Sequence, residues 1–200
     1  MAGELEITKH PKPLKDAAKE FILSLPSGGL IFHGTLNKKI GEIKEQGLIG
    51  KKWLGLHFYS FTLSNTNLDS PKTIKDLMQK FRNSIEKNVR WANIHSSFID
   101  IDSENIIEED LPAIVVARKP TDSRQAEYAQ PNEFPHEYSY TEITPEDILA
   151  IVSLTPEEYR NIIEKVKVSK SKKPTIKINE EIGKLLSRKI LRGLTQRNGL

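Results

Sequence analysis

A histidine, a glycine and a threonine come directly after the short apolar run Leu30-Ile31-Phe32. An apolar run of this length predicts a strand, so His33 lies at the exposed end of that strand. Gly34 has no side chain, and a ligand can therefore approach its backbone closely. Together with the hydroxyl of Thr35, these residues suggest a ligand site at a strand end.

Two further features follow His33 along the chain. The segment Ile40–Gln46 predicts a short helix that is stopped by Gly47-Leu48. An aromatic, β-prone segment, Trp53–Thr62, then predicts a second strand, which carries Tyr59. This order resembles the NAD-binding half of the ADP-ribosyltransferases of the diphtheria-toxin and poly(ADP-ribose) polymerase clade. In that clade a strand ending in His-Gly-Ser/Thr, a short helix ending in Gly-Leu and a strand bearing a tyrosine follow one another.

The resemblance covers residues 28–154 and implies a role for each of these side chains. His33 would hydrogen-bond the adenosine ribose of NAD, and Thr35 would support His33. The backbone of Gly34 would bond the nicotinamide carboxamide. Tyr59 would stack on the nicotinamide ring, because an electron-poor pyridinium is attracted to an aromatic face. The alternative for Tyr59 is an ordinary half-buried strand tyrosine, and the register of its strand decides between the two.

The same family uses a catalytic glutamate that begins a late strand, just after a loop that contacts the substrate. Glu137 fits this place, because it opens the β-prone segment Glu137–Thr141 after the polar loop 120–135. Glu127 and Glu133, within the loop, are the alternatives. A fixed carboxylate stabilises the positive charge that develops on the ribose as the nicotinamide–ribose bond breaks. Since the leaving nicotinamide is neutral, one glutamate is enough, without the paired carboxylates of glycosidases.

Periodicity and end signals predict the remaining elements. Strands cluster at 30–62 and 113–154 with helices around them, which indicates an α+β fold. The resemblance implies a core of two small antiparallel sheets, a split β-sheet, with NAD in the cleft between them. The further helices are expected at Leu14–Leu25, at Thr73–Trp91, from Thr155-Pro156 to Val168 and at Glu180–Leu194, and the further strands at Ala113–Ala117 and Ile148–Leu154.

The chain has 200 residues, 37% hydrophobic and 28% charged, which is ordinary for a soluble globular protein. The absence of cysteine excludes disulfides, thiolate zinc sites and a cysteine nucleophile, and we expect no metal site. No apolar run approaches the roughly 20 residues of a membrane-spanning helix, and no apolar signal region opens the chain. We therefore expect no membrane partner. The expected location is the cytoplasm, or outside the cell as an effector or toxin secreted without a signal peptide.

Positive charge is concentrated near the C-terminus. From Lys165 to Arg197 there are eleven Lys or Arg residues and only two acidic ones. This imbalance predicts a catalytic domain at 1–168 and a basic helical appendage at 169–200. The appendage would be a solvated helix face or a docking surface for nucleic acid or another acidic partner.

These observations predict an enzyme that cleaves NAD and transfers its ADP-ribose to a protein or nucleic-acid acceptor. There is no glycine-rich dinucleotide fingerprint and no Walker sequence, so a Rossmann fold is not expected. The alternatives are an NAD glycohydrolase, an RNA 2′-phosphotransferase, and a non-catalytic module that binds nucleic acid or protein. The phosphotransferase needs clustered arginines, and the candidates are scattered in sequence: Arg82, Arg90, Arg118 and Arg124.

Overall fold

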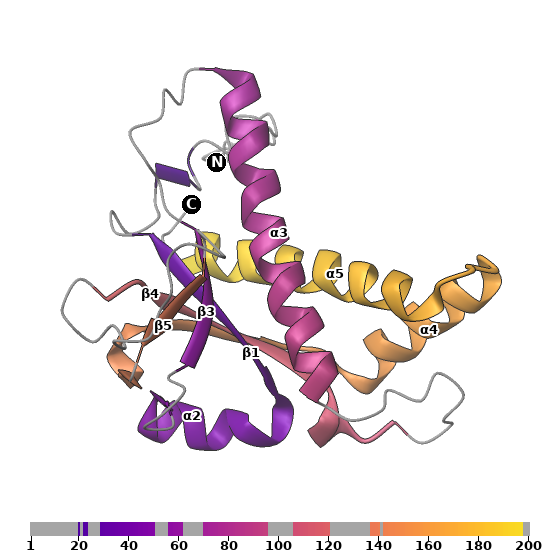
Figure 1. Ribbon diagram of the computed structural model, residues 1–200, viewed down its shortest axis with the longest axis horizontal. Coiled ribbons are helices and arrows are strands. Elements are labelled where there is room, and N and C mark those ends of the chain that lie inside the picture. The colour runs from indigo at the N-terminus through magenta and orange to yellow at the C-terminus, as the bar shows by residue number, and fades with distance from the viewer. Residues whose placement is uncertain are drawn as a thin grey trace, which may run out of the picture.

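The computed structural model describes residues 20, 22–23, 29–50, 56–61, 70–95, 106–120, 137–140 and 142–197; for 56–61 and 137–140 the description is of the backbone. These residues form an α+β fold of helices and antiparallel sheets (Figure 1). The strands are β1 (Leu30–Leu36), β2 (Leu48–Ile49), β3 (Leu56–Phe61), β4 (Pro112–Arg118), β5 (Glu137–Tyr140), β6 (Glu142–Ile143) and β7 (Ile148–Ser153). The helices are α2 (Ile40–Gln46), α3 (Pro71–His95), α4 (Pro156–Val168) and α5 (Pro174–Arg197), with short 3-10 turns at Asn37–Lys39, Glu108–Asp110 and Pro145–Asp147.

Five of the strands form one sheet in the order β5-β3-β1-β4-β7, and β2 pairs with β6 in a second sheet. Every neighbouring pair is antiparallel. β1 lies at the centre of the larger sheet, between β3 and β4, and pairs along its whole length with the apolar β4. Side chains alternate between the two faces of a strand, so each face of this sheet has a core of its own.

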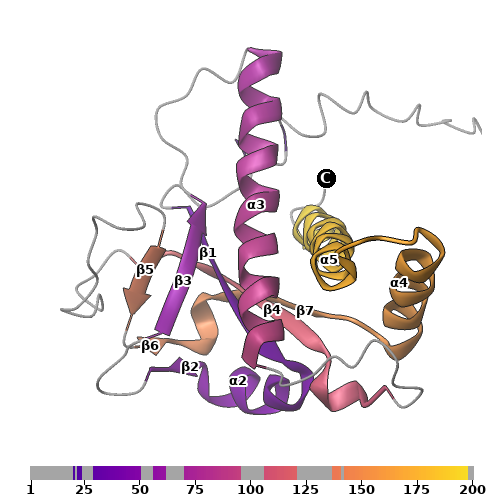
Figure 2. The same cartoon turned by 45° about the vertical axis from the view of Figure 1, so that its right-hand side comes forward.

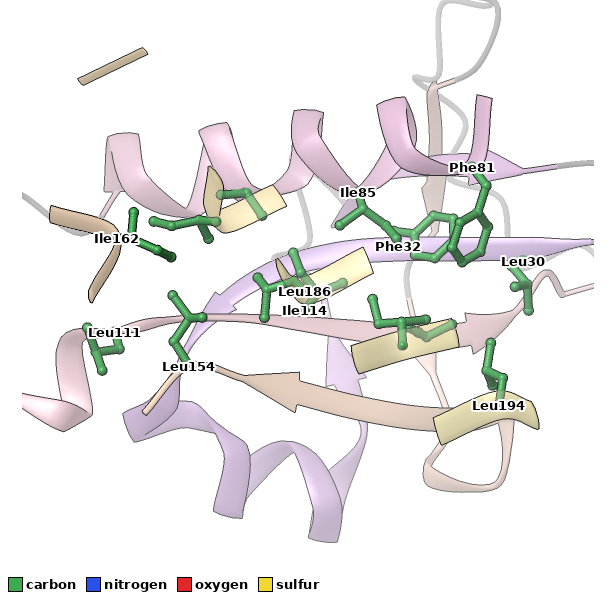
Figure 3. Packing of buried hydrophobic residues seen from close by; sticks show 14 of the residues in the cluster. Leu30, Phe32, Phe81, Ile85, Leu111, Ile114, Leu154, Ile162, Leu186 and Leu194 are labelled. Carbon is green, nitrogen blue, oxygen red and sulfur yellow. The ribbon is translucent and has the colours of Figure 1, made fainter. Parts of the chain in front are cut away.

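The larger core lies on the face covered by α3, α4 and α5. Phe32 of β1 is fully buried there, and its ring forms a T-shaped pair with the Phe81 ring of α3, with centroids 5.3 Å apart (Figure 3). Each helix buries one side at intervals of three or four residues, which is the amphipathic pattern of a surface helix. The buried helix residues are Ile74, Leu77, Phe81, Ile85 and Val89 on α3, Tyr159, Ile162, Ile163 and Val166 on α4, and Ile178, Ile182, Leu186, Ile190 and Leu194 on α5.

A smaller core lies on the opposite face. Ile31 of β1 and Val115 of β4 pack there with Ile43 of α2, Leu48 of β2 and Ile143 of β6. The two-stranded sheet and α2 are thus held against the large sheet by a cluster separate from the main core. This arrangement fixes α2, which follows His33 in sequence, on one defined face of β1.

The packing of α5 corrects the expected division of the chain at residues 168 and 169. Ile182, Leu186 and Ile190 are fully buried in the main core, and α5 lies beside α3 (Figure 2). Lys189 of α5 also donates a 2.7 Å hydrogen bond from Nζ to the carbonyl oxygen of Ser153 at the end of β7. The last helix therefore belongs to the same packed unit as the sheet and is not an appendage.

The structure confirms the predicted bounds of α2 and the predicted start of α4. α2 spans Ile40–Gln46 as expected. α4 begins after Thr155, whose hydroxyl accepts a hydrogen bond from the Glu158 backbone N–H while the Glu158 side chain accepts one from the Thr155 N–H. This reciprocal capping box satisfies two backbone donors of the first turn. Of the helix expected at Leu14–Leu25, Glu20, Ile22 and Leu23 are helical, and the rest lies outside the described residues.

Gly47 joins α2 to the second sheet in a conformation that an L-residue avoids. Its φ is 78° and its ψ is −160°, a region populated almost only by glycine. A Cβ at this position would lie 2.2 Å from the carbonyl oxygen of Ile143 in β6. The glycine therefore permits both the sharp end of α2 and the close approach of β6.

Gly47→Ala is expected to lower the free energy of unfolding by about 2 kcal/mol or more, because backbone strain and the clash add together. Gly41 is the control, since it lies within α2, the helix that Gly47 ends, and a Cβ there would meet nothing within 4 Å. Gly41→Ala should be neutral or stabilise by about 0.5–1 kcal/mol through helix propensity. Urea denaturation of both variants measures the difference, and equal effects would show that Gly47 is not constrained.

Candidate site where β1 and β3 separate

The five-stranded sheet splits next to His33. The ladder between β1 and β3 runs only from the pair Leu30–Phe61 to the pair Phe32–Tyr59. On its other side β1 continues to pair with β4 as far as Leu36. Figure 2 shows β1 and β3 diverging beyond their shared segment, toward α2 and β2. We call the space between the diverging strands the β1–β3 split.

The strand order brings the three predicted site residues to the root of this split. Tyr59 pairs with Phe32 of β1 on one side and with Glu137 of β5 on the other. His33 follows Phe32 and is the first residue of β1 beyond the shared ladder. Strands that are far apart in sequence thus carry positions 33, 59 and 137 onto three neighbouring strands, β1, β3 and β5.

His33 lies on the face of the smaller core. Its register partner is Val115, a member of that core, and partners in an antiparallel ladder share a face. The histidine is half-buried. Gly34 and Thr35 follow it along the same margin of β1, opposite Ile114 and Ala113 of β4.

The register does not place positions 59 and 137 in the same row as His33. Both align with Phe32, the residue before the histidine, and successive positions of a strand alternate between its faces. The aromatic positions in the register of His33 are instead Phe58 and its partner Tyr138. Sequence reasoning missed this pair, because only the observed pairing of β3 with β5 identifies it.

A ligand lying in the split would meet residues of two branches of the sheet. One branch is the part of β1 from His33 to Leu36, held by β4. The other branch is β3 with β5, which remain paired down to Leu56–Tyr140. In a split sheet a ligand can contact the free edges of the separated strands as well as the faces of the sheet. Residues from the two faces can therefore border the same space. Glu127 and Glu133, the alternatives to Glu137, lie outside the described residues.

A polar depression of about 540 Å³ lies just beyond the end of β1, lined by Asn37, Ile107, Glu108 and Glu109. Its rim is held by the 3.0 Å hydrogen bond from the Asn37 backbone N–H to the Leu111 carbonyl oxygen. Its charged side chains are carboxylates, which repel the pyrophosphate of a dinucleotide. The depression is therefore a poor site for NAD, even though it is close to Thr35 in sequence.

Within the described residues, no helix is long and apolar enough to cross a membrane. Comparisons with protein-family models, with curated proteins and with solved structures find no match. Inference about function therefore depends on the chain's own motifs and on the geometry of the β1–β3 split.

Proposed function

We propose that this protein binds NAD⁺ at the β1–β3 split and transfers its ADP-ribose to a macromolecular acceptor. The observation that supports this proposal is that positions 33, 59 and 137 lie on three consecutive strands next to the root of the split. Each of the three residues is also predicted by a motif in the sequence, which does not depend on how the strands pair. β1, β3 and β5 are consecutive in the sheet, and the pairing of β1 with β3 ends at Phe32 and Tyr59.

Each branch of the split has its own task in this proposal. On β1, His33 holds the adenosine ribose, and the backbone of Gly34 holds the nicotinamide carboxamide, where the lack of a side chain permits close approach. On β3, Tyr59 contacts the nicotinamide ring. On β5, Glu137 stabilises the positive charge on the ribose as the bond to nicotinamide breaks.

Transfer then needs only an acceptor nucleophile on the face of the ribose opposite the departing nicotinamide. The products are nicotinamide and an ADP-ribosylated acceptor, and the acceptor's proton passes to solvent or to the glutamate. Water in place of the acceptor gives the glycohydrolase reaction at the same site. A phosphotransferase is less well supported, because Arg118 pairs with Leu30 at the end of β1 remote from Thr35 and Arg82 is exposed on α3.

NAD⁺ at a hundredfold excess over its Kd is expected to stabilise the protein by about 2.7 kcal/mol, which raises Tm by on the order of 5–10 °C for a chain of this size. His33→Ala should remove most of that rise, because it deletes the ribose contact. His95→Ala is the matched control, since it changes the same residue type at the end of α3. Differential scanning fluorimetry measures the rise, and nicotinamide release measures turnover.

If millimolar NAD⁺ produces neither a rise in Tm nor nicotinamide release in the unaltered protein, the proposal is wrong. If His33→Ala and His95→Ala lose the rise equally, NAD⁺ binds elsewhere. Labelled NAD⁺ incubated with a cell lysate, with and without nuclease, then separates protein acceptors from nucleic-acid acceptors.

A further inference from the structure

The connection between α4 and α5 carries a concentrated positive charge. Residues 165–177 include six lysines and no acidic residue, and five of these lysines are exposed. Figure 1 shows this connection on the opposite side of the molecule from β5, where it projects from the fold. We call residues 165–177 the basic tip. The six lysines are Lys165, Lys167, Lys170, Lys172, Lys173 and Lys177.

Acidic residues of α5 neutralise only part of this charge. Glu181 accepts hydrogen bonds from Lys165 and Lys184, and these bonds lower its pKa to about 2. Lys177 pairs with Glu180 at 3.0 Å. For Lys170, Lys172 and Lys173, no ion pair with an acid occurs in the part of the chain that the structure describes. These three lysines are in the turn itself, where α5 begins without an acidic residue in its first turn.

The basic tip also exposes aliphatic side chains. Val168, the last residue of α4, is 81% exposed, and Ile176, in the first turn of α5, is 46% exposed. They flank the turn that holds Lys170, Lys172 and Lys173. Exposure of aliphatic side chains to water at the apex of a projecting hairpin is unfavourable, and their transfer into an apolar medium is favourable.

These features distinguish between possible anionic partners. The basic tip contains no arginine and no aromatic residue. In nucleic-acid recognition, arginine forms bidentate hydrogen bonds with phosphates and aromatic side chains stack on bases. Clustered lysines are attracted to an anionic lipid surface without specific geometry. Exposed aliphatic residues among them can enter the boundary between headgroups and acyl chains.

We propose that the basic tip docks the protein on the surface of a membrane that contains anionic lipids. The lysines surround the apex and contact lipid phosphates, while Val168 and Ile176 enter the interface. The sequence-based expectation of no membrane partner rested on the lack of a spanning segment, and peripheral docking needs none. This inference is independent of the NAD chemistry, because the tip and the β1–β3 split lie on different parts of the fold.

Sedimentation with vesicles tests the proposal on the full chain. Binding is expected to phosphatidylcholine vesicles that contain about a quarter phosphatidylserine, and not to phosphatidylcholine alone. Replacing Lys170, Lys172 and Lys173 together with Gln should weaken binding by on the order of 100-fold. The matched control replaces Lys72, Lys75 and Lys80 with Gln, which removes the same charge from exposed positions on α3 and should have little effect.

A second pair of variants separates membrane docking from simple attraction to polyanions. Val168→Ser and Ile176→Ser keep every charge, and they should weaken binding to the anionic vesicles several-fold. Equal binding by these variants and the unaltered protein would overturn the role of the aliphatic residues. Tight, salt-dependent binding to duplex DNA or RNA without binding to the anionic vesicles would overturn the proposal itself, as would equal losses from the two lysine triples.

Discussion

Glu137→Gln is expected to bind NAD⁺ about as well as the unaltered protein and to cleave it on the order of 10²–10³-fold more slowly, by analogy with the loss of one oxyanion-hole donor. Glutamine has nearly the same shape as glutamate and lacks its charge. In the proposed mechanism that charge matters where positive charge develops on the ribose, which is in the transition state more than in the ground state. The expected signature is therefore a large fall in kcat with a nearly unchanged NAD-induced rise in Tm.

Glu142 provides a matched control for this variant. It lies in β6, a few residues after Glu137, and its side chain is exposed. Glu142→Gln should retain full activity, because Glu142 pairs across from Ile49 in the second sheet and not with a strand of the split. Glu127→Gln and Glu133→Gln should also lose much less than Glu137→Gln.

Each possible result for these glutamates identifies a different error. If Glu127→Gln is the inactive variant, the mechanism stands and the glutamate was assigned wrongly. If all of the glutamine variants cleave NAD⁺ at the unaltered rate, the chemistry lies elsewhere. If Glu137→Gln loses the rise in Tm together with its activity, the residue serves binding and not the transition state.

Local signals in the sequence were enough to predict the helices near the site. α2 ends at Gly47, because glycine adopts the positive φ of the turn that follows the helix at no steric cost. α4 begins where Thr155 and Glu158 cap each other. Both signals depend on a few neighbouring residues, so they can be read without knowledge of the rest of the fold.

The strand β1 was predicted too short for a physical reason. The prediction ended at Phe32 because the apolar run ends there, whereas the strand continues to Leu36. Its second half begins with His33, Gly34 and Thr35 and is only half-buried, and its ladder with β4 keeps it extended. Periodicity of apolar residues cannot reveal a strand that is held by a neighbour distant in sequence.

Pairing between strands is the part of the site that the sequence does not contain. Nothing local indicates that Tyr59 aligns with Phe32 and with Glu137, because β3 and β5 are separated by a long helix and another strand. A shift of the register by one residue would place Tyr59, instead of Phe58, in the row of His33. The two-residue strands β2 and β6 were missed for the same reason, since only their pairing defines them.

The division at residues 168 and 169 was wrong because charge was given more weight than spacing. The last helix contains apolar residues four positions apart, at Ile178, Ile182, Leu186, Ile190 and Leu194. That spacing forms one stripe along a helix, and the basic residues occupy the other sides. The helix is therefore amphipathic, and its stripe completes the core over β1, β4 and β7.

Removal of residues 170–200 is expected to abolish folding, and not merely to weaken acceptor docking. Burying a large aliphatic side chain contributes a few kcal/mol, since Leu→Ala or Ile→Ala changes in cores cost about 2–5 kcal/mol each. The truncation removes five such side chains, while a domain has only about 5–15 kcal/mol of stability in total. The shortened chain should show no cooperative thermal transition by circular dichroism.

Single substitutions distinguish the loss of buried area from the loss of a basic surface. Ile182 is fully buried and Ile176 is 46% exposed on the same helix, so the same Ile→Ala change samples the two environments. Ile182→Ala should lower the free energy of unfolding by about 2–5 kcal/mol, whereas Ile176→Ala should change it by less than about 0.5 kcal/mol. A truncated chain that still melts cooperatively, together with an Ile182→Ala variant as stable as Ile176→Ala, would restore the view of the last helix as an appendage. Because α5 packs against both α3 and β7, loss of NAD⁺ cleavage in a truncated chain that shows no cooperative transition would report unfolding and not a catalytic role for the lysines that were removed.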